Sequence, residues 1–284
     1  MHFERPAEPE DFEDKVRAAR EAVARAVEAG QKPEFDDKWG SYKRFFATAQ
    51  RRKCAYCEVT TVNHDPAIDH FAPKSAVWEL SDVGDERGHE IMEDLPNVRG
   101  RTSKSRSERG YWWRAYEWEN FLLVCSACNS KWKECYFPVA EADRCWPPDP
   151  EVTETPLLLN PFDDEAPWRH FRFGESGVMA ADPESTRGEA TLVTLGFERR
   201  ESMRLHREGF ATDAYGHARA FVRAWLDEND VRAGFELENM RRLGADTRDH
   251  AGMVRAICEH VTGLRWDELV ALASSLLSSA RRDD

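Results

Sequence analysis

The sequence contains no long apolar run. Its longest uninterrupted apolar stretches are the five-residue segments Phe121–Cys125 and Leu269–Ala273, whereas a membrane-spanning helix needs about 20 apolar residues. The N-terminal residues are acidic and include no hydrophobic region of the kind found in a secretory signal. These two absences predict a cytoplasmic protein with no membrane segment.

The chain also lacks an excess of basic residues. Its 284 residues include 40 Lys and Arg against 53 Asp and Glu, a net charge of −13. Nucleic-acid-binding proteins usually carry a basic surface, so this total argues against such a partner. The charge is uneven, however: residues 41–133 carry 15 basic and 13 acidic side chains, and residues 134–284 carry 18 and 29. The objection therefore applies to the second half of the chain more than to the first.

Seven cysteines are present, and an odd number without a signal peptide disfavours a disulfide framework. Four of them form two C-x-x-C pairs, Cys54/Cys57 and Cys125/Cys128. Each turn can direct two thiolates at one tetrahedral ion, so the two pairs predict a structural Zn2+ site with four cysteine ligands. The alternative is a pair of unrelated buried or redox-active turns.

Hydrophobic periodicity predicts a helix-rich α+β protein organised in four segments. They are an N-terminal helical segment (1–50), a motif-bearing core (51–139), a proline-rich wrap with a small hairpin (140–198) and a C-terminal helical region (199–284). Helices are expected at 11–29, 41–50, 199–228, 231–243, 248–262 and 266–280. A strand is expected at 67–71, a loop at 81–97, and an extended segment leading into a helix at 120–132.

The core segment contains four polar residues that could take part in catalysis. Asp69 and His70 come after the first cysteine pair, Asn120 precedes the second pair, and Asn129 follows it directly. Phosphodiester hydrolysis needs a base that activates water and positive charge near the phosphate. A neutral imidazole can act as that base near physiological pH, which makes His70 the candidate. Asp69 and the Asn129 amide oxygen are candidate ligands for Mg2+ or Mn2+, although each residue taken singly is more often structural.

This order and spacing resemble the HNH, or ββα-metal, nucleases. The resemblance implies a central ββα-metal core in which the acid and the histidine close the first strand. It implies that Asn120 holds the loop carrying His70 through backbone hydrogen bonds, and that Asn129 takes the third motif position on the helix. The expected activity is endonucleolytic hydrolysis of DNA with a catalytic Mg2+ or Mn2+, and the zinc is expected to be structural.

A closer resemblance rests on longer stretches of sequence. The segments CAYCE, IDHFAPK, YEWENFLLVCSACNSKWK and YFP are similar to the HNH component of Septu-type and retron-associated anti-phage systems. LLLNPFDDEAPWRHFRF and TLVTLGFERRESMRLHR are similar to the C-terminal half of that family, so the likeness covers about residues 40–210. It implies an ABC-type ATPase as a protein partner. Asp69 stands where glutamate is associated with many relatives, and both are hard oxygen ligands.

Four basic residues are candidates for contact with the phosphate backbone of a substrate: Lys74, Arg101, Arg106 and Lys133. Arg101 and Arg106 belong to the locally basic segment 97–116, which holds six basic side chains and one acidic side chain. Lys133 lies four residues after Asn129, one turn along the expected helix, and an ordinary solvated lysine is the alternative there. Two other functions are also compatible with the sequence: a zinc-stabilised nucleic-acid-binding or adaptor protein with an inactive nuclease fold, and a stand-alone restriction-type HNH enzyme.

Overall fold

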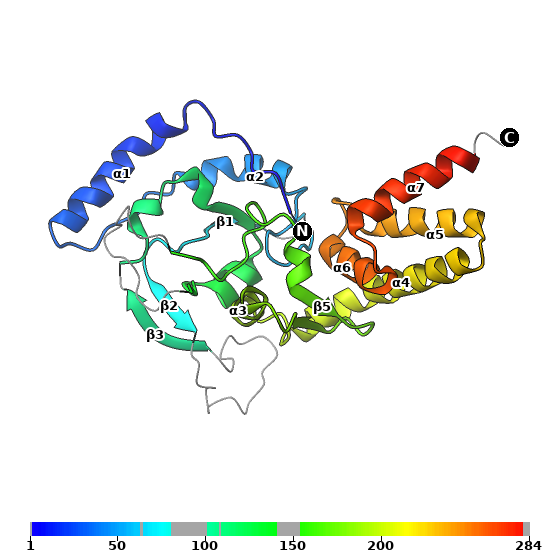
Figure 1. Ribbon diagram of the computed structural model, residues 1–284. Coiled ribbons are helices and arrows are strands. Elements are labelled where there is room, and N and C mark those ends of the chain that lie inside the picture. The colour runs from blue at the N-terminus through cyan, green and yellow to red at the C-terminus, as the bar shows by residue number, and fades with distance from the viewer. Residues whose placement is uncertain (1, 63–64, 81–100, 108, 141–153, 281–284) are drawn as a thin grey trace. The chain divides into compact units, whose positions relative to one another are not determined.

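The computed structural model describes residues 2–62, 65–80, 101–107, 109–140 and 154–280 (Figure 1). The chain divides into two compact units. The N-terminal unit comprises residues 2–165 and 185–196, and the C-terminal unit comprises residues 166–184 and 197–284. Helices predominate and the sheets are small, as the composition and periodicity predict. The four predicted segments are distributed over these two units.

The N-terminal unit combines helices with two antiparallel sheets of two strands each. Its helices are α1 (Phe12–Glu28), η1 (Trp39–Tyr42), α2 (Lys43–Ala49), η2 (Trp112–Arg114), η3 (Trp118–Asn120), η4 (Ala127–Lys133) and α3 (Thr186–Leu195). Its strands are β1 (Ala67–His70), β2 (Val77–Leu80), β3 (Arg101–Ser107) and β4 (Phe121–Val124), and β1 pairs with β4 while β2 pairs with β3. The sequence patterns do not indicate β2 or β3, and the whole of the loop expected at 81–97 lies outside the described residues.

The pair of β1 and β4 lies in the core of the N-terminal unit. All four side chains of β4 are 0% exposed. Trp118, just before β4, packs against Phe12 of α1 and Phe46 of α2, with ring centroids 5.1 and 4.7 Å apart. Burial of each large apolar side chain contributes about 1.5–3 kcal/mol, so this cluster fixes the strand that leads to the second cysteine pair. The register places His70 opposite Phe121, at the end of β1.

Helix α3 corrects the expectation of a proline-rich wrap over 140–198. Both of its ends carry ordinary helix signals. Ser185 accepts a hydrogen bond from the Gly188 backbone N–H at 2.8 Å, as an N-cap does, and Gly196 ends the helix in the left-handed conformation with φ +60°. The prolines that suggested an extended segment all lie before residue 184, so none of them interrupts α3.

Gly196 also lies against the ring of Trp132. A Cβ atom at Gly196 would come within 1.8 Å of Trp132 Cζ3. We expect Gly196→Ala to lower the free energy of unfolding by about 2–4 kcal/mol, because left-handed strain adds to overpacking. Urea denaturation measures this loss. Gly30→Ala is the matched control, since Gly30 has φ +72° with nothing within 4 Å of the added Cβ; equal losses in the two variants would rule out a role for the Trp132 contact.

The C-terminal unit is mainly helical. It contains η5 (Pro167–His170), the hairpin of β5 (Phe171–Phe173) and β6 (Met179–Ala181), and α4 (Glu201–Leu226), α5 (Asp230–Leu243), α6 (Ala251–Thr262) and α7 (Trp266–Ala280). These elements confirm the hairpin and the four C-terminal helices. Buried alanines on α4, at 211, 214 and 218, let α4 pack closely with α5 and α6. Among the described residues, no helix is long and apolar enough to cross a membrane.

Candidate functional site

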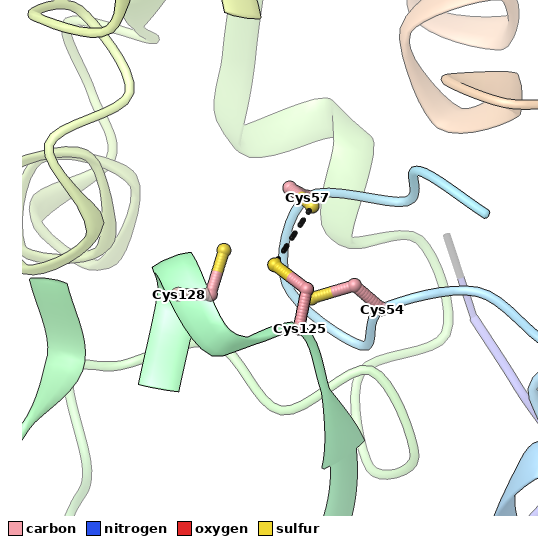
Figure 2. Close-up of side chains that lie close together, drawn as sticks. All are labelled: Cys54, Cys57, Cys125 and Cys128. Carbon is pink, nitrogen blue, oxygen red and sulfur yellow. Dashed lines mark hydrogen bonds between the residues drawn. The ribbon is translucent and has the colours of Figure 1, made fainter. Parts of the chain in front are cut away.

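The two cysteine pairs meet at one place in the N-terminal unit. Figure 2 shows Cys54 and Cys57 on one turn, Cys125 at the end of β4 and Cys128 on η4, with their sulfur atoms gathered together. The four Sγ atoms all lie within 4.8 Å of one another, and those of Cys57 and Cys125 are 3.9 Å apart. A tetrahedral Zn2+ with Zn–S bonds of about 2.3 Å separates its sulfur ligands by about 3.8 Å, so this arrangement fits zinc.

The electrostatics of the cluster also fit a divalent ion. Burial raises the pKa of the Cys54 thiol, and hydrogen bonding to neighbouring cysteines raises the pKa of Cys57. Hydrogen bonds from the other three thiols lower the pKa of Cys125. Four neighbouring thiolates repel one another unless a cation compensates their charge. Among the described residues, these four cysteines are the single group of three or more His, Cys, Asp or Glu side chains that could share an ion.

His70 lies in a closed aromatic environment at the end of β1. Its ring is 4% exposed and meets Trp39 and Phe121 edge-on, with centroids 4.5 and 5.3 Å apart. His70 Nε2 lies 2.9 Å from the carbonyl oxygen of Ala115. Because a carbonyl only accepts hydrogen bonds, Nε2 carries a proton, and Nδ1 is the unprotonated nitrogen of the neutral ring. Burial, followed by the charge of Lys74, lowers the pKa of His70 well below 6.5, so the ring is neutral at pH 7.

Asn120 holds the segment that follows His70. Its Oδ1 accepts a hydrogen bond from the Ala72 N–H at 2.7 Å, and its Nδ2 donates to the Ala72 and Arg114 carbonyls at 3.0 Å each. The Asn120 carbonyl also accepts from the Phe71 N–H at 2.8 Å. These hydrogen bonds tie the segment that follows His70 to Asn120 and to the Arg114 carbonyl, which immediately precedes Ala115.

The Asp69 carboxylate has two partners in the interior. Lys133 Nζ lies 3.3 Å from Oδ1 and 3.1 Å from Oδ2, and the Tyr56 hydroxyl donates to Oδ2 at 2.8 Å. Lys133 Nζ also donates to the His70 carbonyl at 2.8 Å and is completely buried. Burial raises the pKa of Tyr56, with the Asp69 charge adding to the effect, so the phenol keeps its proton. Lys133 is therefore not the solvated side chain offered above as the alternative.

The helix type explains why Lys133 points inward. η4 is a π-helix, and the Glu134 N–H bonds to the Asn129 carbonyl at 2.9 Å, five residues back. In a π-helix, residues five apart share a face, so Cys128 and Lys133 both point into the unit. In a regular α-helix the same two residues would be rotated by about 140° from each other. The sequence alone indicates a helix here but gives no sign of the π turn.

Lys74 is the second lysine near His70. Its ammonium lies 4.6 Å from the centroid of the Trp39 ring and 5.7 Å from that of Phe35, positions typical of cation–π contacts. Burial lowers its pKa. In the described part of the chain it forms no ion pair, which suits a lysine that contacts phosphate. Arg101 and Arg106 lie on β3, and their side chains are outside the described structure.

Asn129 lies on the same helix as Lys133 and is half-buried. Within the described residues its side-chain amide has no hydrogen-bond partner. One carboxylate and one amide oxygen, completed by water and substrate, are a donor set that Mg2+ or Mn2+ accepts. In the described residues the contacts of the Asp69 carboxylate are with Lys133 and Tyr56, so it is engaged by a cation and a hydroxyl group.

One comparison with known proteins gives a clear match. The chain is 32% identical over 151 residues to the Septu protein PtuB of Bacillus mycoides (strain KBAB4). The match covers 52% of this chain and 44% of the relative, so the chain spans less than half of the relative it matches. No family model matches the chain. No solved structure matches it either.

Proposed function

We propose that this chain is a metal-dependent HNH endonuclease that hydrolyses phosphodiester bonds in DNA. The observation that carries the proposal is the state of His70. Its imidazole is neutral, and Nε2–H donates to the Ala115 carbonyl. Asp69 precedes it on the same strand, and Asn120 holds the segment that follows the strand. An ordinary core histidine needs neither the adjacent carboxylate nor two nearby lysines.

In this proposal His70 is the general base. Its Nδ1 accepts the proton of a water molecule whose oxygen attacks phosphorus, and the Ala115 carbonyl stabilises the resulting imidazolium through Nε2–H. Asn120 is a positioning residue, because it holds the backbone around the His70 ring. Lys74 contacts the phosphate through its ammonium group. Arg101 and Arg106 are proposed to contact the DNA backbone further away.

Asp69 and Asn129 would hold a Mg2+ or Mn2+ ion, which would neutralise the negative charge that grows on the phosphate and the leaving oxygen. The four cysteines would hold Zn2+ in a structural role. Tyr56 links the two centres, because it lies between Cys54 and Cys57 and donates to Asp69 at 2.8 Å. The zinc turn thereby positions the carboxylate of the proposed catalytic centre.

We further propose a role in a Septu-type anti-phage system, acting with an ABC-type ATPase. The similarity to a Septu protein over half of the chain supports this assignment. The net charge of −13 supports a need for a partner, since it weakens the attraction of the isolated chain for DNA. A gene for an ATPase next to the gene for this chain is the expected genomic context.

A cleavage assay tests the proposal. The zinc-loaded protein is incubated with supercoiled plasmid, linear duplex DNA and RNA, in Mg2+, Mn2+ or EDTA, with and without the neighbouring ATPase and ATP. We expect metal-dependent nicking of DNA, slow for the isolated chain and faster with the ATPase. The alternative is a zinc-stabilised adaptor with an inactive nuclease fold. The ion pair between Lys133 and Asp69 favours it, because it occupies the proposed metal ligand. Absence of cleavage under every condition would establish that alternative.

The lowered pKa of His70 gives a pH prediction. Since the ring loses its proton well below pH 6.5, kcat/KM for cleavage should stay level from pH 7 to below 6.5 and fall only in more acidic solution. Lys74→Met removes a positive charge that lowers this pKa, so the acidic limb should move towards neutral pH. A pH–rate profile of the wild type and of Lys74→Met measures the shift. Acidic limbs that coincide in the two proteins would contradict the assignment of His70 as the base.

The same shift has a consequence for stability. The unfolded chain binds a proton at this imidazole near pH 6.5, whereas the folded chain binds it only at lower pH. The contribution of neutral His70 to folding is therefore complete above about pH 6.5 and is lost as the pH falls towards the folded-state pKa. Acid titration of the unfolding free energy should show this loss.

A further inference from the structure

The carboxylate proposed to hold the catalytic metal ion already has a cation beside it. Lys133 Nζ lies 3.3 and 3.1 Å from the two oxygens of Asp69. The pair is enclosed: Lys133 is 0% exposed and Asp69 is 6% exposed. Inside a protein such a pair is held more strongly than at the surface, because water screens it little.

The position of Lys133 is fixed by three independent features. The π turn of η4 directs its side chain inward, together with that of Cys128. The His70 carbonyl accepts a hydrogen bond from Nζ at 2.8 Å. The Tyr56 hydroxyl donates to Oδ2 of the same carboxylate and holds it in place. The ammonium thus lies at the carboxylate and next to the backbone of the proposed general base.

The local charge balance shows what a divalent ion would meet. Two ammonium groups act on this carboxylate: Lys133 contacts it directly, and Lys74 interacts with it electrostatically while Asp37 interacts with Lys74. Adding a divalent ion while both lysines remain would give a strongly positive centre of small volume. A divalent ion therefore binds this carboxylate favourably only if Lys133 moves away from it.

We propose that Lys133 is a resident cation of the catalytic centre, which occupies the Asp69 carboxylate and competes with the divalent metal ion for it. The inference rests on the proposed function, since it takes Asp69 as the metal ligand. In this inference Lys133 is a positioning residue that sets the affinity for the metal ion. It replaces the role expected from the sequence, in which Lys133 contacts the phosphate directly. Lys133 should hold the carboxylate until a metal ion, accompanied by substrate phosphate, replaces it.

Metal binding can be measured without cleavage. We would titrate zinc-loaded protein with Mn2+ and follow free Mn2+ by electron paramagnetic resonance, for the wild type, Lys133→Met and Lys131→Met. Lys131 is the matched control because it lies on the same helix and is exposed. Lys133→Met should bind Mn2+ about tenfold more tightly or better, since its Asp69 carboxylate keeps the Tyr56 hydrogen bond but has lost its cation. Lys131→Met should bind like the wild type, and Asp69→Asn should abolish the gain in the Lys133→Met background.

Each outcome decides the proposal. Equal or weaker Mn2+ binding by Lys133→Met would overturn it and would show that Lys133 supports the metal site. If Lys133→Met does not fold alone, refolding is repeated with Mn2+: recovery of the fold supports competition, and failure with Mn2+ present contradicts it. Because no nucleic acid is used, tighter Mn2+ binding without cleavage would defeat the proposed nuclease function and leave this inference standing. Cleavage that requires His70, together with an unchanged Mn2+ affinity in Lys133→Met, would support the nuclease function and overturn this inference.

Discussion

Replacing His70 with alanine should reduce metal-dependent DNA cleavage by about 10²–10⁴-fold, the range typical of a lost general base. The reason is structural. His70 Nε2–H is fixed on the Ala115 carbonyl, and the ring nitrogen left to accept a proton is Nδ1. The measurement is the initial rate of plasmid nicking at saturating Mg2+ or Mn2+, together with the zinc content of each protein.

Two further variants separate chemistry from folding. His70→Gln keeps an N–H donor near Ala115 but has no base of suitable pKa, so it should be as inactive as His70→Ala while unfolding closer to the wild type. His260→Ala is the matched control, because His260 is an exposed histidine at the end of α6. Cleavage that persists in both His70 variants would exclude the mechanism proposed for this centre.

Removal of the four-cysteine site should have the largest effect on stability. Cys128→Ser is expected to lose zinc and to unfold the N-terminal unit, because structural zinc contributes about 10–16 kcal/mol in small zinc-binding peptides. Three of the four cysteines are buried, and the site joins the turn before β1 to the end of β4. The loss should therefore extend to the β1–β4 pair and to His70.

Zinc analysis and hydrogen exchange measure this prediction. Amides of the β1–β4 pair should lose protection in Cys128→Ser, while those of α4 to α7 should keep it, because these helices share a hydrophobic cluster of their own. Cys135→Ser is the control, since Cys135 follows the same helix and lies outside the cluster. A Cys128→Ser protein that retains one zinc per chain would mean that the four-cysteine assignment is wrong.

The four-cysteine cluster that could hold zinc could be predicted from the sequence because it depends on short spacings. A C-x-x-C turn brings two thiols together by local geometry alone, and two such turns are enough for one ion. The long helices could be predicted for a similar reason, since their apolar residues recur with the helical period. Helix α3 was missed although Ser185 and Gly196 mark its ends, because prolines upstream of it suggested an extended chain.

The arrangement around Asp69 could not be read from the sequence. Tyr56 and Lys133 lie 13 and 64 residues from Asp69, and only the packed unit brings them to one carboxylate. Lys133 looked like a substrate contact because an α-helix would place it on the same face as Asn129. The π turn of η4 brings Lys133 round towards the side of buried Cys128, and sequence periodicity gives no signal for one turn of a different helix type.

The sequence by itself thus determined the four cysteines that could hold zinc, the order Asp69-His70, Asn120 and Asn129, and most of the helices, since each depends on residues close together along the chain. The tertiary structure decided the protonation of the His70 ring and the partners of Asp69. Both depend on burial and on charges brought from distant segments, and no local spacing encodes them. The two lysines show the difference most clearly: Lys74 lies over aromatic rings near His70, and Lys133 holds Asp69 in the interior.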